Sequence, residues 1–385
     1  MPGQTFYKNK PYVFVPFIKK VNRSQCVSRQ NALSRNYELG KIRILITAIS
    51  PLHFGQGKII ADTDTSNGKI EFIHALNREN GCIALPGSSF KGMLRAFFEA
   101  ITQSCVLFFP KNKNIKNAMP NENLLPYNSN SKGLLCPACS IFGCSGYKGK
   151  LNFSSFYACK NASIENYNIP QLQSPFKDYP KNKYRDDNGG YGNERLYYGV
   201  LPAYKGSEVG NLTKEQFFRE KNNKKNSEIQ FYGRKFYKHA NKQETEDASE
   251  GNIFECLEPG ETLEGTITYQ GLKTEELAAL VFALGMGWAP PIYHKLGYAK
   301  PAYFGSVLIK IEAIDMPERY KNIGIARNTQ DLQELAKQYR TRVSEDVLNT
   351  GNALNAIEVF EQTWTSLEEP SQWSLPQEGG QIKMY

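Results

Sequence analysis

The chain has 385 residues, of which 40% are hydrophobic, 12% aromatic and 22% charged, a composition typical of globular proteins that excludes a disordered or collagen-like chain. It contains no apolar run of about eighteen residues and no N-terminal segment resembling a cleavable signal, so we expect neither a membrane span nor secretion. The net charge of +9 is uneven, because the first 245 residues contain 36 Lys and Arg against 17 Asp and Glu, whereas the last 140 contain 11 against 21. The basic part favours a polyanionic partner, although a solvated charge imbalance without function is the alternative.

In chain order, residues 1–40 are basic and irregular, and we expect an arm that docks on another surface. Residues 41–50 carry isoleucines and an alanine at every second position, which predicts a strand with a buried face. A PLHFGQG segment and a polar loop follow. The segment LPGSSFKGMLR (85–95) then predicts a helix that begins near Ser88 or Ser89, whose hydroxyls can cap free backbone amides.

Later in the chain, a long stretch rich in Asn, Lys, Tyr and Gly shows weak periodicity and is interpreted as an insertion. Regular patterns then predict a strand over 261–270, a helix over 274–284 capped by Thr274, a strand over 305–311 and acidic helices over 328–365. We therefore divide the chain into a basic arm (1–40), a core (41–160 and 256–315) that includes a zinc-stapled segment (about 105–159), an insertion (161–255) and an acidic helical extension (316–385).

This order of elements predicts an α+β fold, with helices on one face of an antiparallel sheet and the other face free for a ligand. RNA-recognition modules use that geometry, but the chain lacks their pair of aromatic RNA-binding signatures.

Clustered cysteines predict a metal site. Cys136 and Cys139 form a C-x-x-C turn, Cys144 follows closely, and Cys105 is the first choice for a fourth ligand, with Cys159 the second. In a chain without a signal segment this spacing favours structural zinc over disulfides. Redox chemistry at the C-x-x-C pair and simple buried thiols are the alternatives.

The start of the helix at LPGSSFKGMLR is a predicted anion site. Unpaired backbone amides and the positive end of the helix dipole point outward there. Lys91 and Arg95 lie four residues apart, on one helical face, and cations so early in a helix oppose its dipole unless an anion compensates them. Gly87 and Gly92 have the spacing of a nucleotide-hydrolysing P-loop, but Met93 stands where that loop needs its lysine, so that activity is excluded at this site. An ordinary helix with a solvated basic face is the alternative.

Three further features carry weaker signals. Asp62 and Asp64 lie in a polar loop where two carboxylates could bind a metal or move a proton in phosphodiester cleavage, or could belong to an ordinary turn. His53 follows the first strand and is interpreted as a packing residue in preference to a general base. Basic and aromatic residues alternate between 147 and 237, beginning with Lys148 and Lys150, a pattern that suits single-stranded nucleic acid or the packing of the insertion.

Taken together, PLHFGQG after a strand, LPGSSFKGMLR at a helix start, CPACSIFG before a strand and the late GYAKPAYFGSV segment resemble the RAMP superfamily, and more narrowly the backbone subunits of type III CRISPR effector complexes. The resemblance covers residues 42–156 well and 260–312 loosely. It implies a ferredoxin-like core related to the RNA-recognition motif and a cytoplasmic, prokaryotic ribonucleoprotein in antiviral defence. It also implies guide RNA, target RNA and other subunits as partners.

The resemblance also implies site residues. Asp62 or Asp64 would cleave guide-paired target RNA with a divalent metal such as magnesium, the attacking group being the target's own 2′-hydroxyl. Gly55, Gly57, Gly87, Ser88, Ser89, Lys91 and Arg95 would contact the guide backbone. From the residues themselves we add His53, Lys148 and Lys150 to the expected RNA contacts. Two other functions stay open: a purely structural RNA-binding subunit without cleavage, and a guide-processing endoribonuclease that uses His53 as its base.

Overall fold

The computed structural model describes residues 36–62, 70–102, 104–106, 134–169, 252–288, 291–316 and 327–350, with short pieces at 12–15, 21, 23–25, 172, 200–202, 229–231, 234–237, 239, 243, 245 and 325. Its main sheet has eight strands, seven of which neighbour one another in the order β19 (Tyr293–Lys295), β20 (Ser306–Asp315), β3 (Glu38–Ala48), β18 (Thr262–Leu272), β12 (Phe156–Ala158), β7 (Cys82–Leu85) and β6 (Arg78–Glu79). The eighth, β11 (Leu151–Phe153), also pairs with β18. Every pairing in this sheet is antiparallel.

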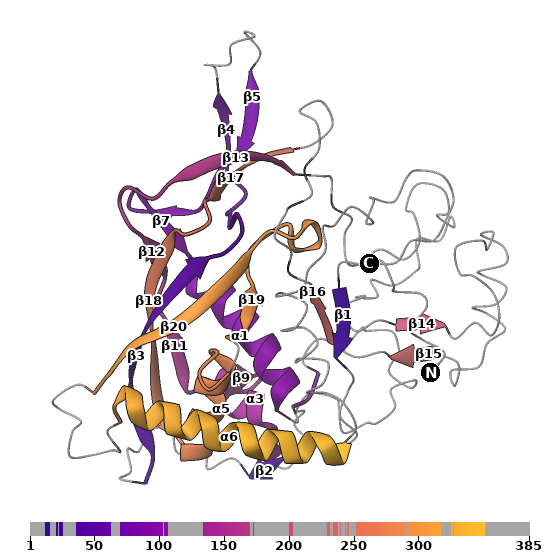
Figure 1. The fold of residues 1–385 in the computed structure, drawn as a ribbon, viewed down its shortest axis with the longest axis vertical. Helices are drawn as coiled ribbons and strands as arrows, with labels where there is room; N and C mark the ends of the chain where they lie inside the picture. Colours follow the sequence, from indigo (N-terminus) through magenta and orange to yellow (C-terminus); the bar gives the residue numbers. More distant parts are fainter. Residues whose placement is uncertain are drawn as a thin grey trace.

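Two helices, α1 (Gly87–Ile101) and α5 (Thr274–Ala283), lie against each other on one face of this sheet (Figure 1). Along β3, Ile42, Ile44 and Ile46 are buried under them, because alternate side chains of a strand point to the same face. On α1 the fully buried Phe90, Leu94 and Phe98 are spaced four residues apart, so they form one stripe toward the sheet. Burying a phenylalanine of this kind stabilises the fold by about 2–3 kcal/mol.

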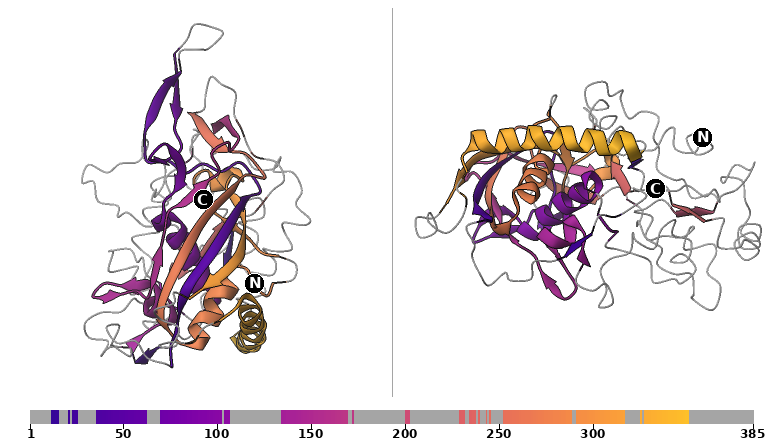
Figure 2. Two further views of the ribbon diagram at one scale, coloured as in Figure 1. Left: turned by 90° about the vertical axis from the view of Figure 1, so that its left-hand side faces the viewer. Right: turned by 90° about the horizontal axis from the view of Figure 1, so that it is seen from below.

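The connectivity through this core is strand, helix, strand, strand, helix, strand. The chain runs from β3 through α1 to β11 and β12, then through β18 and α5 to β20. Across the sheet these strands lie in the order β20, β3, β18, and then β12 with β11. Counted along the chain, with β11 and β12 as one strand, this is the order fourth, first, third, second. The longest of the described helices, α6 (Thr329–Thr350), packs on α5 and crosses the lower end of the molecule in Figure 1; Figure 2 shows it end-on in the left view and from below in the right view.

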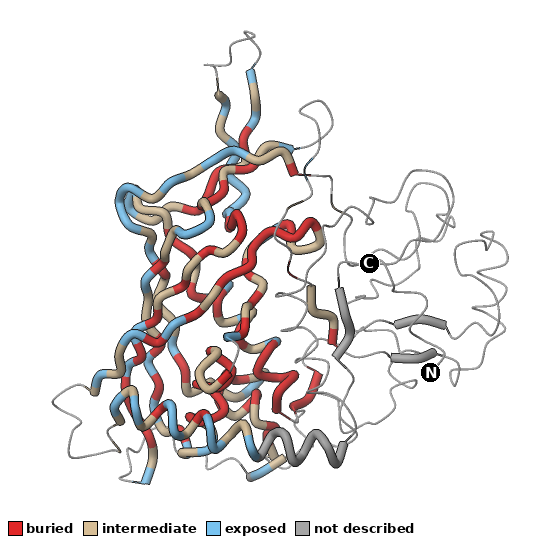
Figure 3. The backbone as a smooth tube through the Cα atoms, in the orientation of Figure 1, coloured by how far each residue is buried: buried red, intermediate tan, exposed pale blue. Residues whose placement is uncertain are grey.

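A second sheet has four strands in the order β13 (Ile164–Ile169), β17 (Asn252–Leu257), β5 (Glu71–His74) and β4 (Ile59–Asp62). β17 and β5 are parallel, and the other two pairs are antiparallel. β4 and β5 form a hairpin that projects from the body, and Figure 3 shows its strands as largely exposed or half-buried, whereas α1, α5 and β3 are mostly buried. Because β13 pairs with β17, the chain enters and leaves the predicted insertion through neighbouring strands.

Smaller pairings tie distant segments together. The N-terminal arm pairs through β1 (Tyr12–Val15) with β16 (Arg234–Tyr237), and through β2 (Ser24–Gln25) with β8 (Leu134–Leu135). The remaining short elements are β9 (Gly143–Cys144) with β10 (Tyr147–Lys148), β14 (Val200–Pro202) with β15 (Ile229–Phe231), the helix α3 (Pro137–Phe142) and the 3-10 turn η6 (Lys300–Ala302). The arm therefore contacts both the zinc-stapled segment and the insertion.

The predicted α+β class is confirmed, and β3, α1, β18, α5 and β20 lie where periodicity placed them. Two predicted caps are wrong. Pro86 precedes α1 with no side-chain cap, and α5 begins after Lys273, whose amide donates to Glu276. Thr274 instead donates its hydroxyl to the buried carboxylate of Glu38. Of the expected C-terminal helices, α6 is seen, and residues 351–385 lie outside the described part.

The sheet face opposite the helices carries charges of both signs. Its exposed side chains include Lys41, Arg43, Lys310, Glu264, Glu312 and Asp315. Arg43 pairs with Asp315, and Lys310 pairs with Glu312. Cation and acid balance there, so this face offers no general attraction for a polyanion. None of the described helices combines the length and apolar character needed to cross a membrane.

Candidate metal centre and nucleic-acid interface

Three cysteines from two parts of the chain meet beneath the end of α1. Cys136 precedes α3, Cys139 lies within it, and Cys105 follows α1. Their sulfur atoms lie within 4.8 Å of one another, with Cys136–Cys105 and Cys105–Cys139 separations of 3.4 and 3.6 Å, and all three side chains are buried. Sulfur atoms around a tetrahedral zinc ion with bonds of about 2.3 Å would lie about 3.8 Å apart, so the spacing fits.

The protonation of these thiols also suits a cation. Hydrogen bonding with Cys105 and Cys139 lowers the pKa of Cys136, whereas hydrogen bonding within the cluster and burial raise the pKa values of Cys105 and Cys139. The cluster thus favours one thiolate whose charge the other two thiols stabilise. A bound metal ion would let the remaining thiols lose their protons.

Cys144, the other predicted ligand, is not one of the three residues whose sulfur atoms lie within 4.8 Å of one another. α3 ends at Phe142, and Gly143, with a φ of 90°, turns the chain into β9, which contains Cys144. A Cβ at position 143 would lie 2.7 Å from the Gly149 amide nitrogen, so only glycine fits this turn. Cys159, the other candidate, is exposed and contacts Glu261.

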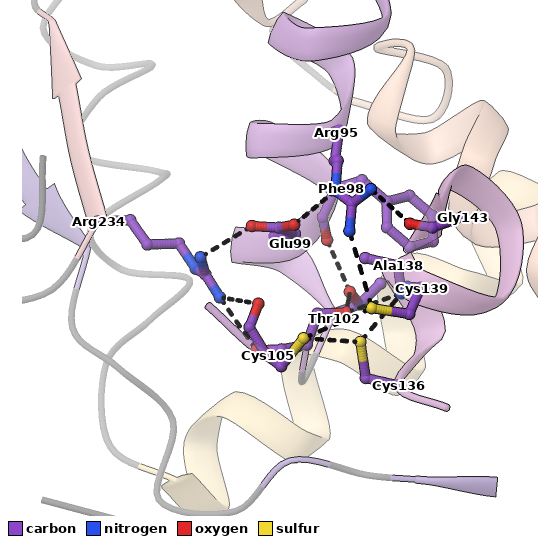
Figure 4. Close-up of polar contacts among 11 residues, drawn as sticks. Arg95, Phe98, Glu99, Thr102, Cys105, Cys136, Ala138, Cys139, Gly143 and Arg234 are labelled. Atoms are coloured by element: carbon purple, nitrogen blue, oxygen red, sulfur yellow. Dashed lines mark hydrogen bonds and ion pairs between the residues drawn. The ribbon is translucent and has the colours of Figure 1, made fainter. Parts of the chain in front are cut away.

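A buried ionic network surrounds the sulfurs (Figure 4). Glu99 on α1 accepts from Arg95 at 2.8 Å and from Arg234 on β16 at 3.0 Å, and all three side chains are at most 12% exposed. Arg95 also donates to the carbonyl of Gly143 at 2.7 Å and lies 3.7 Å from the sulfur of Cys139. Burial raises the pKa of the Glu99 carboxyl, and the two guanidinium groups oppose that rise.

These contacts change the interpretation of Arg95. Sequence spacing placed it with Lys91 on an outward cationic face, but its guanidinium is directed into the protein and bonded on several sides. The network also links three distant segments, since Arg234 donates to the carbonyls of Ser104 and Cys105. Neither Glu99 nor Arg234 was singled out from the sequence as part of this site, because no local pattern connects two residues 135 positions apart.

The first turn of α1 retains the features of an anion site. Ser88 and Ser89 are exposed, no acidic residue occupies the turn, and no side chain caps its amides. Lys91 is half-buried there, and burial lowers its pKa, with the charge of Arg95 adding to the effect. Position 87 also requires glycine for steric reasons, because a Cβ there would lie 2.4 Å from the carbonyl oxygen of Ser154.

In the PLHFGQG segment the two glycines are exposed to solvent, whereas the histidine is buried. Gly55 and Gly57 are exposed, and Gly57 has a φ of 86°. His53 is only 4% exposed; its Nδ1 lies 2.7 Å from the carbonyl of Glu255, and its ring packs edge-on against Phe254. Burial lowers the pKa of His53, which keeps the ring neutral at pH 7.

The remaining predicted contacts lie apart from one another. Lys150 forms a 2.7 Å ion pair with Glu276 on α5 and is largely buried, whereas Lys148 on β10 is exposed. Asp62 ends β4 of the projecting hairpin, opposite Glu71, and Asp64 lies outside the described residues. Among the described residues, the first turn of α1 and the sulfur cluster are the two sites at which predicted residues lie together. Asp62 lies apart from both, because the projecting hairpin that carries it belongs to the second sheet.

Comparison with protein families gives one match. A family model described as RAMPs, the RAMP superfamily, matches residues 45–288, well over half of the chain. The matched span includes α1, all three clustered cysteines, both strands of the projecting hairpin and α5. No curated protein matches the chain significantly.

Proposed function

Because the chain belongs to the RAMP superfamily, whose members bind CRISPR RNA and assemble with other Cas subunits, we propose that it is a guide-RNA-binding backbone subunit of a type III CRISPR ribonucleoprotein. Its core connectivity and strand order support a ferredoxin-like fold. The observation that carries the proposal is the first turn of α1, where Ser88 and Ser89 are exposed and Lys91 is partly exposed, with no acidic residue in the turn and no side-chain cap.

A charge reversal at Lys91 tests this role. We expect Lys91→Glu to weaken binding of CRISPR RNA about tenfold or more at moderate salt and to flatten the dependence of affinity on salt, because a phosphate contact is lost. Lys310→Glu is the matched control, since Lys310 is also exposed but lies on the balanced sheet face. Fluorescence anisotropy with labelled guide measures both. Equal affinities for wild type and Lys91→Glu would refute the proposed contact.

We propose structural zinc at Cys105, Cys136 and Cys139, where thiolate ligands would fix the end of α1 against α3. Zinc would supply charge neutralisation and a rigid cross-link, with no catalytic part. Metal emission from purified protein should show zinc in the wild type and its loss in Cys136→Ser. Cys256→Ser changes a cysteine that is equally buried outside the cluster and should keep the metal. Redox chemistry would instead show as a disulfide without metal.

For target cleavage we propose Asp62 or Asp64 as the acid, holding a divalent ion such as Mg²⁺ near the 2′-hydroxyl of the target. The support is the position of Asp62 at the end of β4 in the projecting hairpin, whose strands are exposed or half-buried, so that a nucleic acid could reach it. Asp62→Ala and Asp64→Ala, singly and together, should abolish target cleavage by the reconstituted complex. Retained cleavage would favour the alternative, a structural subunit whose complex cuts elsewhere.

A guide-processing nuclease with His53 as base is disfavoured by burial. A general base must lie within hydrogen-bond reach of its substrate, and this ring is enclosed between Glu255 and Phe254. We expect His53→Ala to leave any trimming of precursor guide by the isolated protein unchanged, apart from a loss of stability. Abolished trimming by a folded variant would restore that function.

A further inference from the structure

Part of the outer edge of β20 has no strand beside it. β3 pairs with β20 along nearly its whole length, but β19 covers the opposite edge only over Ser306–Leu308. No other strand of the described chain neighbours β20. The pairing with β3 becomes irregular after Ile311, so the regular stretch of open edge is Ile309–Ile311. An open edge of this kind is a template for a further strand.

The backbone groups of Ile309 and Ile311 point toward this open edge. The carbonyl of Ser306 accepts from the amide of Ile49 at 2.8 Å, so Ser306 faces β3. Backbone groups alternate in direction along a strand, and Ile309 and Ile311 follow Ser306 by an odd number of residues, so their groups face away from β3. In agreement, a Cβ at Gly285 would lie 3.8 Å from the carbonyl oxygen of Ile309. The edge therefore offers N–H donors and C=O acceptors in alternation.

The protein surface is hollowed beside this edge. A hollow of about 430 Å³ lies between β20, the turn after α5 and α6, a volume within the range of ligand pockets. Its apolar lining includes Met286, Ile309 and Ile311, and a methionine adapts its shape to different partners. Lys310 and Lys337 also line the hollow, and both are exposed, whereas no acidic residue of the described chain lines it. The hollow thus suits apolar side chains with negative charges beside them.

A strand added at this edge would direct its side chains alternately to the two faces of the sheet. Residues directly opposite Ile309 and Ile311 would point into the hollow, because opposite residues of an antiparallel pair share a face. The residue between them would lie beside Lys310 on the other face. Apolar residues suit the first positions and an acidic residue suits the second. A nucleic-acid backbone fits this edge poorly, because its phosphates have no hydrogen to donate to the carbonyls.

We propose that the open edge of β20 binds an extended segment of another subunit by antiparallel strand addition, and that apolar and acidic residues alternate along that segment. Its apolar side chains fill the hollow, its acidic side chains are attracted by Lys310 and Lys337, and its backbone bonds to Ile309 and Ile311. That the partner is a subunit of the same ribonucleoprotein rests on the proposed function. The chemistry of the edge does not, and this surface is separate from the first turn of α1.

Binding of a synthetic peptide to the full-length protein tests the edge. The probe is a fluorescein-labelled peptide of alternating valine and glutamate, and fluorescence anisotropy measures its affinity. N-methylation of the valines removes the amides that would face Ile309 and Ile311, because directly opposite residues exchange the hydrogen bonds. We expect this change to weaken binding about tenfold or more, since buried carbonyls lose their donors. N-methylation of the glutamates removes only outward amides, so that peptide is the matched control and should bind like the parent.

A charge reversal on the protein tests the preference for acidic residues. Lys310 already pairs with Glu312, so Lys337 is the cation to change. Lys337→Glu should weaken binding of the valine–glutamate peptide about threefold or more, and it should strengthen binding of the corresponding valine–lysine peptide. Lys41→Glu is the matched control, because Lys41 is exposed on β3 and does not line the hollow.

Photocrosslinking locates the bound peptide. Benzoylphenylalanine in place of the central valine should crosslink to Met286. Equal affinities of the two methylated peptides, or crosslinks only elsewhere, would overturn the docking edge. Displacement of the peptide by oligouridylate would assign the edge to RNA, and self-association of the chain that the peptide reverses would assign it to a second copy; either result would overturn the proposal.

The two proposals fail separately. If the peptide does not bind but Lys91→Glu still weakens guide binding, the proposed function stands and the docking edge fails. If the folded protein binds the peptide and no guide, the docking edge stands and the proposed function fails.

Discussion

Replacing Glu99 with glutamine removes the carboxylate that bridges the two buried guanidinium groups beside the sulfur cluster. The Arg95 and Arg234 bonds to it measure 2.8 and 3.0 Å, and its side chain is 6% exposed. Water therefore screens the lost attraction poorly, and both guanidinium groups lose the Glu99 charge in the interior. Removing one partner of a buried pair destabilises a protein by about 3–5 kcal/mol.

A surface ion pair of nearly equal length gives the matched comparison. Lys310 and Glu312 lie 2.8 Å apart, with side chains 68% and 40% exposed. Exposed pairs contribute about 0–1 kcal/mol, so Glu312→Gln should change stability little. The two variants alter the same chemical group and differ chiefly in burial.

Urea unfolding of the zinc-saturated protein, followed by circular dichroism, gives the free energy of unfolding for each variant. We expect Glu99→Gln to lose about 3–5 kcal/mol with an unchanged slope. In that background Arg234→Met should cost less than it does in the wild type, because the interaction it removes is already gone. A loss below about 1 kcal/mol, or one equal to that of Glu312→Gln, would refute the reasoning that burial makes this network important for the stability of the fold.

Two further predictions concern the buried imidazoles and the start of α1. Burial lowers the pKa of His294 to about 4, below the value of 6.5 for an exposed ring, so on acidification the unfolded chain takes up a proton before the folded protein does. The free energy of unfolding should therefore be highest above pH 6.5 and fall by roughly 3 kcal/mol toward pH 4. Urea titrations at pH 7 and pH 5 measure this fall, and His294→Gln should make it smaller. An unchanged profile in the variant would contradict this. Gly87→Ala should destabilise the fold by about 1–3 kcal/mol because its Cβ would meet Ser154, whereas Gly92→Ala, which meets nothing within 4 Å, should stabilise α1 by about 0.5–1 kcal/mol. Equal melting temperatures for the two alanine variants would argue against the close approach.

Local sequence patterns located much of the fold and part of the site. Alternating isoleucines identified β3, and phenylalanines at helical spacing identified α1, because burial on one side of a strand or helix imposes a period on the chain itself. The C-x-x-C turn likewise placed Cys136 and Cys139 on one short helix. The family match over 45–288 agrees with the motifs from which a resemblance was inferred.

Partners that are distant in sequence were not predictable in this way. Arg95 has the helical spacing of a surface cation, yet Glu99 and the carbonyl of Gly143 hold it inside. Lys150 similarly pairs with Glu276, 126 positions away.

The sequence by itself determined the main strands and helices of the core (β3, α1, β18, α5 and β20), where the charge concentrates, and which thiols stand close along the chain. The tertiary structure decided which cations are buried and which face solvent, that Cys105 joins the sulfur cluster and Cys144 does not, and that Phe254, His74 and Tyr298 stack. The physical reason is that periodicity records only whether a side chain is turned toward the core. Its partner there depends on strand order and register, which are set by contacts between residues far apart in the chain.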